Sequence, residues 1–347
     1  MRLNYTQEEL LREHDFAELH VIDGQRLHGG FDEEGRYVPP RSKVRPEAIS
    51  NWTSALRERG GDLLDADSSL LSGPRVPNFE QQCLLIGNGL GRVFWNGLTV
   101  TGKIEGRGRM LATTPFPDLQ PLVVEDISDM AIGHLNKGLM IAHGIDEGGI
   151  PEEGIGGHDV MWFIARDLAF GRDAYPDADP PGRIAREEEE GQRRMPAIPL
   201  PYEGFLSFLM NLLLIEFRAE IGFASSQRIF RTTELFPGRE EQALEAAEII
   251  ERIRTDELIH VESLRLYLGE LRSLTLCRED GGTMPGHEIV DPFWQNLVTW
   301  SVGEQPRLVA AQTHASIADM IDEHSDGTGV RKRFDELRDE GYELAAA

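Results

Sequence analysis

The chain contains only two cysteines, Cys83 and Cys277, in 347 residues. Two thiols cannot build a disulfide framework, so a reducing cytoplasm is the expected compartment. Basic side chains are also scarce, because 35 Lys and Arg residues stand against 60 Asp and Glu residues and leave a net charge of −25. This excess of negative charge repels phosphate backbones and anionic bilayers, so neither nucleic acid nor a membrane is expected as a partner.

Long apolar runs are absent as well. The longest stretch, 205–215, is interrupted by Ser207 and Asn211 and is too short to span a bilayer. The N-terminal residues show no basic region followed by an apolar one, so no signal peptide is predicted. The glycine-rich stretch 83–92 has Arg92 where a dinucleotide-binding turn needs its third glycine, and no βαβ repetition follows. We therefore expect a glycine-rich helix or a close packing contact there, and no bound nucleotide cofactor.

Residues 246–272 carry the most informative pattern in the chain. Glu257 and His260 lie on the same helical face as the aliphatic residues Ile249, Ile250, Ile253, Leu264, Leu268 and Leu271. A buried carboxylate is costly unless a cation or another partner stabilises it. Residues three apart on a helix are neighbours, so this Glu and this His can reach one metal ion. The alternative is a buried Glu–His pair joined only by a hydrogen bond.

A second helical pattern, 204–230, also carries acidic residues on its apolar face. Glu216 and Glu220 fall on the stripe formed by Phe205, Phe208, Leu209, Leu212, Leu213 and Phe223. The 37 residues from Glu220 to Glu257 are enough for two antiparallel helices joined by a turn at 235–241. The two helices are therefore predicted to bring these carboxylates to one level.

The segment TDELIHVE, preceded by the two glutamates of the other helix, resembles the ferritin-like superfamily of di-iron and di-manganese carboxylate bundles. The resemblance implies that Glu257 and His260 are metal ligands of the fourth helix. It also implies that Glu220, with Glu216 as a substitute, is the carboxylate of the third. For Glu216 an ion pair with Arg218 or Arg265 is the alternative interpretation.

The predicted fold is mainly α-helical, with a ferritin-like four-helix bundle over 118–275. Its first helix pair is expected at 118–143 and 151–171, with a turn at 144–150. The crossover 172–203 is long, as these bundles require. The flanking parts are an N-terminal extension, 1–117, with helices at 7–14 and 46–59 and an irregular hairpin between them, and C-terminal helices within 276–347, at 292–322 and 330–345.

The first helix pair departs from the family pattern. It offers Asp159 and Trp162 where the family has Glu-x-x-His, and an indole cannot ligate a metal. His158 is the candidate substitute. Asp126 or Asp129 could supply the remaining carboxylate, because either precedes Asp159 by about the number of residues that the family uses. Counting residues outward from the turn at 144–150 instead brings His134 level with His158. The sequence leaves open which of these residues are ligands: Asp126, Asp129, His134 and Asp159.

Oxygen-rich ligation with few histidines suits two iron or manganese ions. The resemblance then implies O2-dependent oxidation of a small organic substrate inside the bundle. The alternative is a helical bundle with a degenerate metal site that binds a ligand or a protein partner. A heme-oxygenase-like fold with the same ligand types, but another helix order, is a third interpretation. The sequence does not determine the oligomeric state, and a homodimer is among the states it leaves open.

Overall fold

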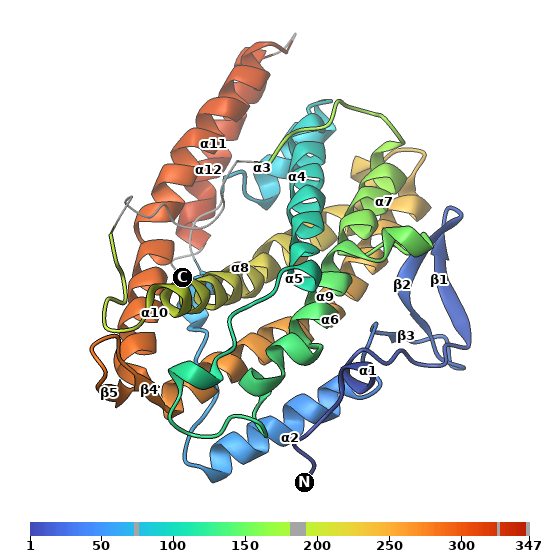
Figure 1. The fold of residues 1–347 in the computed structure, drawn as a ribbon. Helices are drawn as coiled ribbons and strands as arrows, with labels where there is room; N and C mark the ends of the chain where they lie inside the picture. Colours follow the sequence, from blue (N-terminus) through green and yellow to red (C-terminus); the bar gives the residue numbers. More distant parts are fainter. Residues whose placement is uncertain (73–75, 181–191, 325–326, 345–347) are drawn as a thin grey trace.

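The computed structural model describes residues 1–72, 76–180, 192–324 and 327–344, which form a mainly α-helical fold with two small sheets (Figure 1). The α-helices are α1 Gln7–Leu10, α2 Arg45–Glu58, α3 Phe79–Gly87, α4 Arg92–Gly108, α5 Met110–Thr113, α6 Leu139–Gly148, α7 His158–Phe170, α8 Leu200–Arg231, α9 Glu240–Ser273, α10 His287–Val302, α11 Glu304–Asp322 and α12 Gly327–Leu344. Short 3-10 helices are η1 Ser68–Leu71, η2 Gln120–Leu122, η3 Ala131–Lys137, η4 Pro151–Glu153 and η5 Thr233–Leu235. The strands are β1 Glu18–Ile22, β2 Gln25–Phe31, β3 Tyr37–Val38, β4 Thr275–Cys277 and β5 Thr283–Pro285.

Helices α8 and α9 form the centre of the fold, where they lie side by side (Figure 1). They are the longest helices, with 32 and 34 residues, and a short connection at 232–239 makes them antiparallel. Their apolar stripes are buried, and Glu216, Glu257 and His260 are buried with them. The helices predicted over 204–230 and 246–272 are therefore confirmed.

The polar groups of α9 lie between two separate hydrophobic clusters. Ile250 and Ile253 belong to a cluster with α4 and α7, whereas Leu264 and Leu268 belong to a cluster with α2, α10 and the first half of α8. The stretch 256–260 separates the two, and its polar side chains point into the gap between them. Apolar packing on both sides thus holds a polar centre in the interior of the molecule.

The single helix predicted over 118–143 is wrong. The segment forms η2 and η3 before α6 begins at residue 139. Side chains bond to the nearby backbone instead of allowing a helix, as Asp118 and Asp126 each accept a hydrogen bond from the N–H two residues later. Gln120 also accepts from the N–H of residue 127, and Gly138 has a φ of +123° that breaks a helix. The apolar residues of this segment are buried, but they lie in turns and short 3-10 helices instead of one α-helix.

The turn predicted at 144–150 is also wrong, because α6 continues to Gly148. A Cβ added at Gly144 would lie 2.4 Å from the backbone nitrogen of Ala112, so the glycine lets α6 pack directly on α5. The second helix, predicted over 151–171, begins only at His158, after η4.

Helix α4 replaces the expected first helix of the bundle. It packs against both α7 and α6, although it lies within the segment 1–117 that was predicted to be an extension. At Gly102 a Cβ would lie 2.7 Å from the ring of Phe163, so the absent side chain permits close contact between α4 and α7. The helices around the polar gap are therefore α4, α6, α7, α8 and α9.

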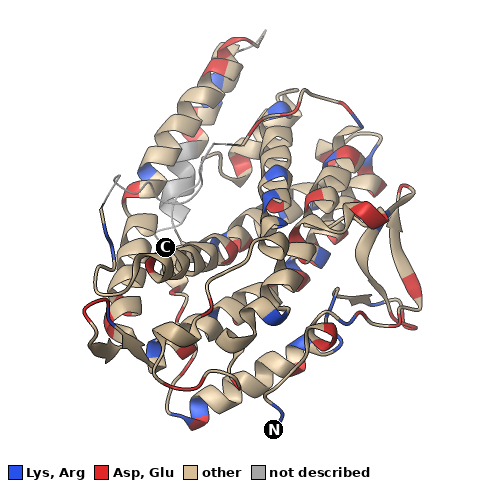
Figure 2. Cartoon of the chain, in the orientation of Figure 1, with Lys and Arg blue, Asp and Glu red and all other residues tan. Residues whose placement is uncertain are grey.

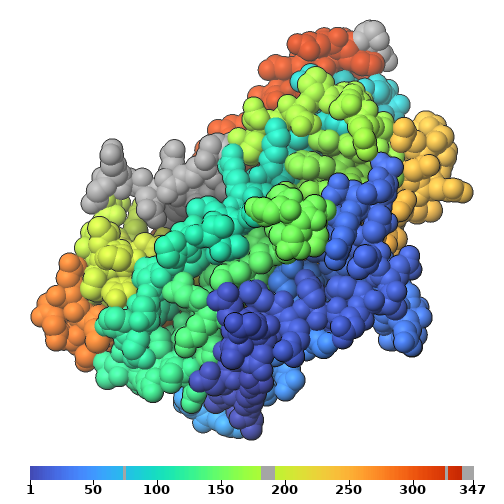
Figure 3. Space-filling model, turned by 45° about the vertical axis from the view of Figure 1, so that its right-hand side comes forward, coloured from blue at the N-terminus to red at the C-terminus, as the bar shows by residue number. Residues whose placement is uncertain are grey.

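The N-terminal residues cover one side of these helices. The helix predicted at 46–59 is confirmed as α2, and the helix predicted at 7–14 is the shorter α1, whose capping box at Thr6 is present. The irregular hairpin is a three-stranded antiparallel sheet in the order β1-β2-β3. In Figure 3 this blue segment covers the lower part of the visible face and lies against the green part of the chain.

The C-terminal segment is helical as predicted, but the range 292–322 forms two helices, α10 and α11, which meet at Gly303, and the range 330–345 corresponds to α12 as far as residue 344. Helix α10 packs on α9 and α8, and α12 packs on α11 and α3. Within the predicted crossover 172–203, residues 181–191 lie outside the described residues. Acidic positions are spread over helices and loops throughout the fold (Figure 2). Among the described residues no helix has both the length and the apolar character required to cross a membrane.

Candidate metal centre

Histidine and glutamate side chains from five helices converge in the polar gap. They form two groups, and within each group the candidate ligand atoms lie within 4.8 Å of one another. Glu147 belongs to both groups. The first group consists of His143, Glu147, Glu216 and His260. The second group consists of Glu105, Glu147, His158 and Glu257. We call these residues together the carboxylate centre.

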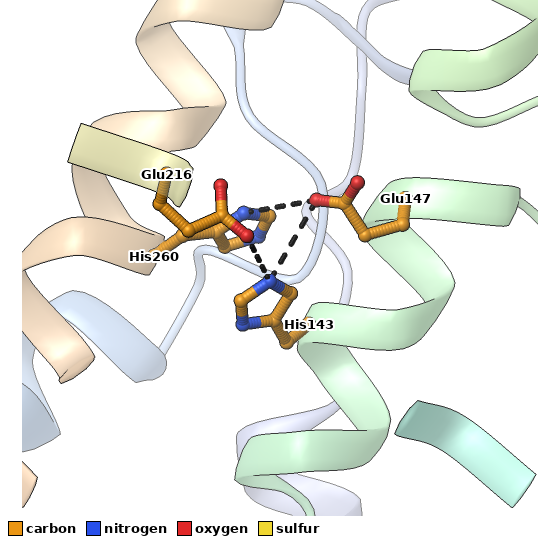
Figure 4. A group of neighbouring side chains, drawn as sticks. All are labelled: His143, Glu147, Glu216 and His260. Carbon is orange, nitrogen blue, oxygen red and sulfur yellow. Dashed lines mark hydrogen bonds and ion pairs between the residues drawn. The ribbon is translucent and has the colours of Figure 1, made fainter. Parts of the chain in front are cut away.

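The first group joins α6, α8 and α9 (Figure 4). His143 Nε2 lies 3.1 Å from Glu216 Oε1 and 3.7 Å from Glu147 Oε1. His260 Nδ1 lies 3.2 Å from the same Glu147 oxygen. The two imidazole rings stack with centroids 3.9 Å apart. Two ring nitrogens and two carboxylates thus face one another across a small space.

The second group joins α4, α6, α7 and α9. His158 Nδ1 lies 3.1 Å from Glu257 Oε1, 3.5 Å from Glu147 Oε1 and 3.7 Å from Glu105 Oε2. His260 Nδ1 connects the groups, because it also lies 2.9 Å from Glu257 Oε2. All these side chains are at least nine-tenths buried.

Three atoms at the centre make no hydrogen bond of acceptable geometry among the described residues. They are Glu147 Oε1, His158 Nδ1 and Glu257 Oε1, and all three are shielded from solvent. Their contacts with one another are ion pairs at 3.1–3.5 Å. Buried polar atoms without a hydrogen bond are rare because each costs about 1–3 kcal/mol. Their convergence fits a metal site, since cations would coordinate these atoms.

An aspartate supports His260 from behind. The Nε2 atom of His260 lies 3.0 Å from Asp146 Oδ2. Arg45 donates to the same oxygen at 2.6 Å, and Arg41 donates to Asp146 Oδ1 from Nε at 2.8 Å and from Nη2 at 2.5 Å. Asp146 is fully buried, and the charges of Arg45 and Arg41 overcome the effect of burial and hold its pKa well below the usual range.

A second aspartate supports His158. Asp256 Oδ2 lies 3.3 Å from His158 Nε2 and 3.2 Å from His28 Nε2, and it accepts a hydrogen bond from the Tyr37 hydroxyl at 2.9 Å. Both His28 and Tyr37 come from the N-terminal sheet. A ligand histidine commonly turns its other nitrogen to a carboxylate, which orients the ring. His158 and His260 both have this arrangement.

The carboxylates of the centre repel one another. Burial, followed by the charges of Glu105, Glu257 and Glu216, raises the pKa of Glu147 well above its usual range. Burial and the charge of Glu257 raise the pKa of Glu216 to about 7. Burial alone would lower the pKa of His158, but the charge of Glu257 and bonds to neighbouring carboxylates raise it well above its ordinary value. Cations among these groups would reverse the repulsion.

The charges of the centre match two divalent cations. The buried glutamates contribute four negative charges when ionised: Glu105, Glu147, Glu216 and Glu257. Behind them, Arg41 and Arg45 both bind Asp146, whereas Asp256 is bound by Tyr37, His28 and His158. The four glutamate charges equal in number those of two divalent ions, one for each group of ligands.

The structure brings four of the sequence-predicted ligands together and leaves one outside. Glu216, Glu257, His260 and His158 all belong to the centre. Glu220 lies one turn further along α8, where it accepts hydrogen bonds from Arg254 at 2.5 and 2.9 Å. Its side chain is 43% exposed, so this pair faces solvent.

The four candidates that the sequence left open, Asp126, Asp129, His134 and Asp159, all lie outside the centre. Asp126 and Asp129 are exposed. His134 is buried, but its Nδ1 bonds to the carbonyl of Met130 at 2.8 Å. Asp159 accepts from the N–H of the next residue. Trp162 packs in the hydrophobic cluster around α4 and α7, as expected for a core residue.

Sequence reasoning missed Glu105, His143 and Glu147. The last two are four residues apart, which is the same-face spacing of a helix. That signal was hidden because the glycines around them favoured a turn. Glu105 lies between glycines on α4, and a Cβ at Gly108 would be 2.6 Å from Glu147. Small residues at this point let the two helices approach.

Comparison of the chain with protein-family models, with curated proteins and with solved structures finds no match. The resemblance to the ferritin-like superfamily therefore stays a prediction. The geometry that any functional interpretation must explain is a buried centre of three histidines and four glutamates, with Glu147 shared between two groups.

Proposed function

We propose that the protein binds two iron or manganese ions in the carboxylate centre and uses them for the O2-dependent oxidation of a small organic substrate. The proposal retains the ferritin-like relationship, with the bundle formed by α4, α6, α7, α8 and α9. One observation carries it: the two groups of four ligands share Glu147, and the buried atoms Glu147 Oε1, His158 Nδ1 and Glu257 Oε1 converge without a hydrogen bond among the described residues.

The donor set supports the choice of metal. Each group offers carboxylates and imidazoles, and neither contains a cysteine. Such oxygen-rich sites suit iron and manganese, whereas soft ions such as Cu(I) require sulfur ligands. When bound, the two ions would supply two electrons to O2 while the substrate supplies two more, and a separate electron donor would restore the ions.

The residues of the centre would have distinct roles. Glu147 would contribute to holding both ions, because it alone belongs to both groups. Glu216 and Glu105 would each complete one group and neutralise one ion. Asp146 and Asp256 would keep the rings of the two histidines oriented, each by accepting from Nε2.

Metal analysis of the purified full-length protein tests the proposal. After anaerobic addition of ferrous or manganous ions and removal of excess, we expect about two ions per chain. A Glu147→Gln variant should lose at least one of them, because the shared carboxylate is gone. The same variant should make the metal-free protein more stable, because glutamine removes the cost of burying an ionisable carboxyl among other glutamates.

Two results would overturn the proposal. One is a wild-type protein that holds neither metal after reconstitution, which would leave a helical binding module. The other is a Glu147→Gln variant that keeps two ions. A Glu220→Gln variant is the matched control, since Glu220 lies on α8 but pairs with Arg254 at the surface, and it should keep the full metal content.

A further inference from the structure

Two cavities reach the carboxylate centre beside α8, and Glu216 lines both. The first lies between α4, α6 and α8 and has a volume of about 310 Å3. Glu105, His143, Glu147 and Glu216 line its inner end. We call it the α6 cavity. Its size lies within the range of small-molecule sites.

The walls of the α6 cavity are mostly apolar. They include Leu111, Phe208, Leu212 and Ile215, of which the last three lie on α8. An apolar wall excludes charged solutes and favours a ligand that can bury hydrocarbon. The cavity therefore connects an apolar binding surface directly to the candidate metal ligands.

Besides the candidate metal ligands, Arg107 and Asn211 add polar groups to the apolar wall. Asn211 lines the cavity and is 9% exposed. Its Nδ2 donates to the carbonyl oxygen of Ser207 at 2.8 Å, which fixes the orientation of the amide. The Oδ1 atom has no hydrogen-bond partner among the described residues. A ligand with an O–H or N–H group would supply the missing donor.

The second cavity is less suited to such a ligand. It lies between α8 and α9, has a volume of about 220 Å3 and also reaches Glu216 and Glu257. Its lining includes the ion pair of Glu220 and Arg254. Its volume is below the range of small-molecule sites, so it leaves less room for an organic ligand. We call it the α9 cavity.

We propose that the α6 cavity binds the organic substrate of the metal centre, and that this substrate is an apolar molecule with one hydrogen-bond donor, which Asn211 Oδ1 accepts. This inference rests on the proposed function for the identity of the centre. Asn211 and Glu216 are five residues apart on α8, which separates them by about 7.5 Å along the helix axis. The position that reacts would therefore lie several bonds away from the donor group.

Binding to the metal-free full-length protein tests the cavity independently of any oxidation. The probes are 1-octanol and its isomer heptyl methyl ether, which have the same atoms but differ in the hydroxyl donor. Calorimetry should show that 1-octanol binds about 10-fold more tightly than the ether, the effect expected of one hydrogen bond. In an Asn211→Leu variant this preference should disappear.

Matched leucine-to-tryptophan substitutions locate the binding site. Leu212→Trp fills the α6 cavity and should abolish octanol binding, whereas Leu258→Trp, in the α9 cavity, should leave it unchanged. Circular dichroism and metal content check that both variants fold. Loss of binding only in Leu258→Trp would overturn the proposal in favour of the α9 cavity. Equal binding of the two probes, or no binding, would also overturn it.

The metal analysis and the probe binding can fail separately. A protein that holds two ions but binds neither probe would retain the metal centre and lose this substrate class. A protein that binds 1-octanol through Asn211 but takes up no metal would retain the cavity as a ligand site and lose the oxidation chemistry.

Discussion

Two halves of the carboxylate centre share one geometry. His260 and His158 both turn Nδ1 toward the glutamates and Nε2 toward an aspartate. Asp146 lies behind the first ring and Asp256 behind the second. Both aspartates are buried, so each needs partners to offset the cost of its charge.

The halves differ in the partners that meet this need. The first aspartate binds the guanidinium groups of Arg41 and Arg45, which are charged at every accessible pH. The second binds the hydroxyl of Tyr37 and the ring of His28. One half is thus held by permanent cations and the other by weaker donors from a small sheet. The two halves therefore share a geometry, but their aspartates should contribute differently to the free energy of unfolding. The following substitutions measure that difference.

Asp146→Asn should have the largest effect. It leaves Arg41 and Arg45 buried without their main anion, and removing one partner of a buried ion pair costs about 3–5 kcal/mol. Urea denaturation of the metal-free protein should show this loss in the free energy of unfolding. A loss below about 1 kcal/mol would contradict the assignment of a strong ionic half.

Asp256→Asn should have a smaller effect on stability. No arginine is left unpaired, and the new amide oxygen can still accept one hydrogen bond, so we expect a loss of about 1–3 kcal/mol. Metal affinity should fall about 10- to 100-fold, because His158 loses the carboxylate that orients it. If this variant proves as unstable as Asp146→Asn, the difference between the halves does not exist.

Tyr37→Phe should cost less again. It removes only the hydroxyl that donates to Asp256, and one such hydrogen bond contributes about 0.5–1.5 kcal/mol. The ring remains to pack against His20 and Phe31. Thermal denaturation compared with wild type measures the change, and an unchanged midpoint would show that Asp256 does not need this donor.

Glu220→Gln should have the smallest effect of the four. Its ion pair with Arg254 is partly exposed to solvent, where such pairs contribute about 0–1 kcal/mol. The same denaturation experiment gives the value. A loss as large as that of Asp256→Asn would show that the surface pair, rather than burial in the centre, governs the stability of this region.

The sequence predicted the part of the centre on α8 and α9 better than the part on the helices that precede them. On α8 and α9, regular apolar spacing identified the helices and showed that Glu216, Glu257 and His260 share their buried faces. On the other side, side-chain bonds from Asp118 and Gln120 to the backbone replaced the expected helix. Apolar spacing cannot distinguish a helix from buried turns when such local bonds compete.

A short sequence repeat accompanies both halves but is not diagnostic. Asp146-Glu147 and Asp256-Glu257 each place a glutamate in the centre and an aspartate behind a histidine. The dipeptide Asp-Glu also occurs at 32–33, 322–323, 335–336 and 339–340. At 335–336 the aspartate also contacts a histidine of another helix, His314, but that pair is partly exposed, whereas the two copies in the centre are buried.

The sequence by itself determined the mainly helical class, the antiparallel pair α8 and α9, and the presence of acidic and histidine side chains on their apolar faces. These properties depend on the spacing of neighbouring residues along one helix. The tertiary structure alone decided that Glu105 and Glu147 join them, that Glu220 turns to Arg254, and that arginines support one aspartate but not the other. Those outcomes depend on how far helices approach and rotate against each other, which side-chain packing sets among residues 34 to 105 positions apart.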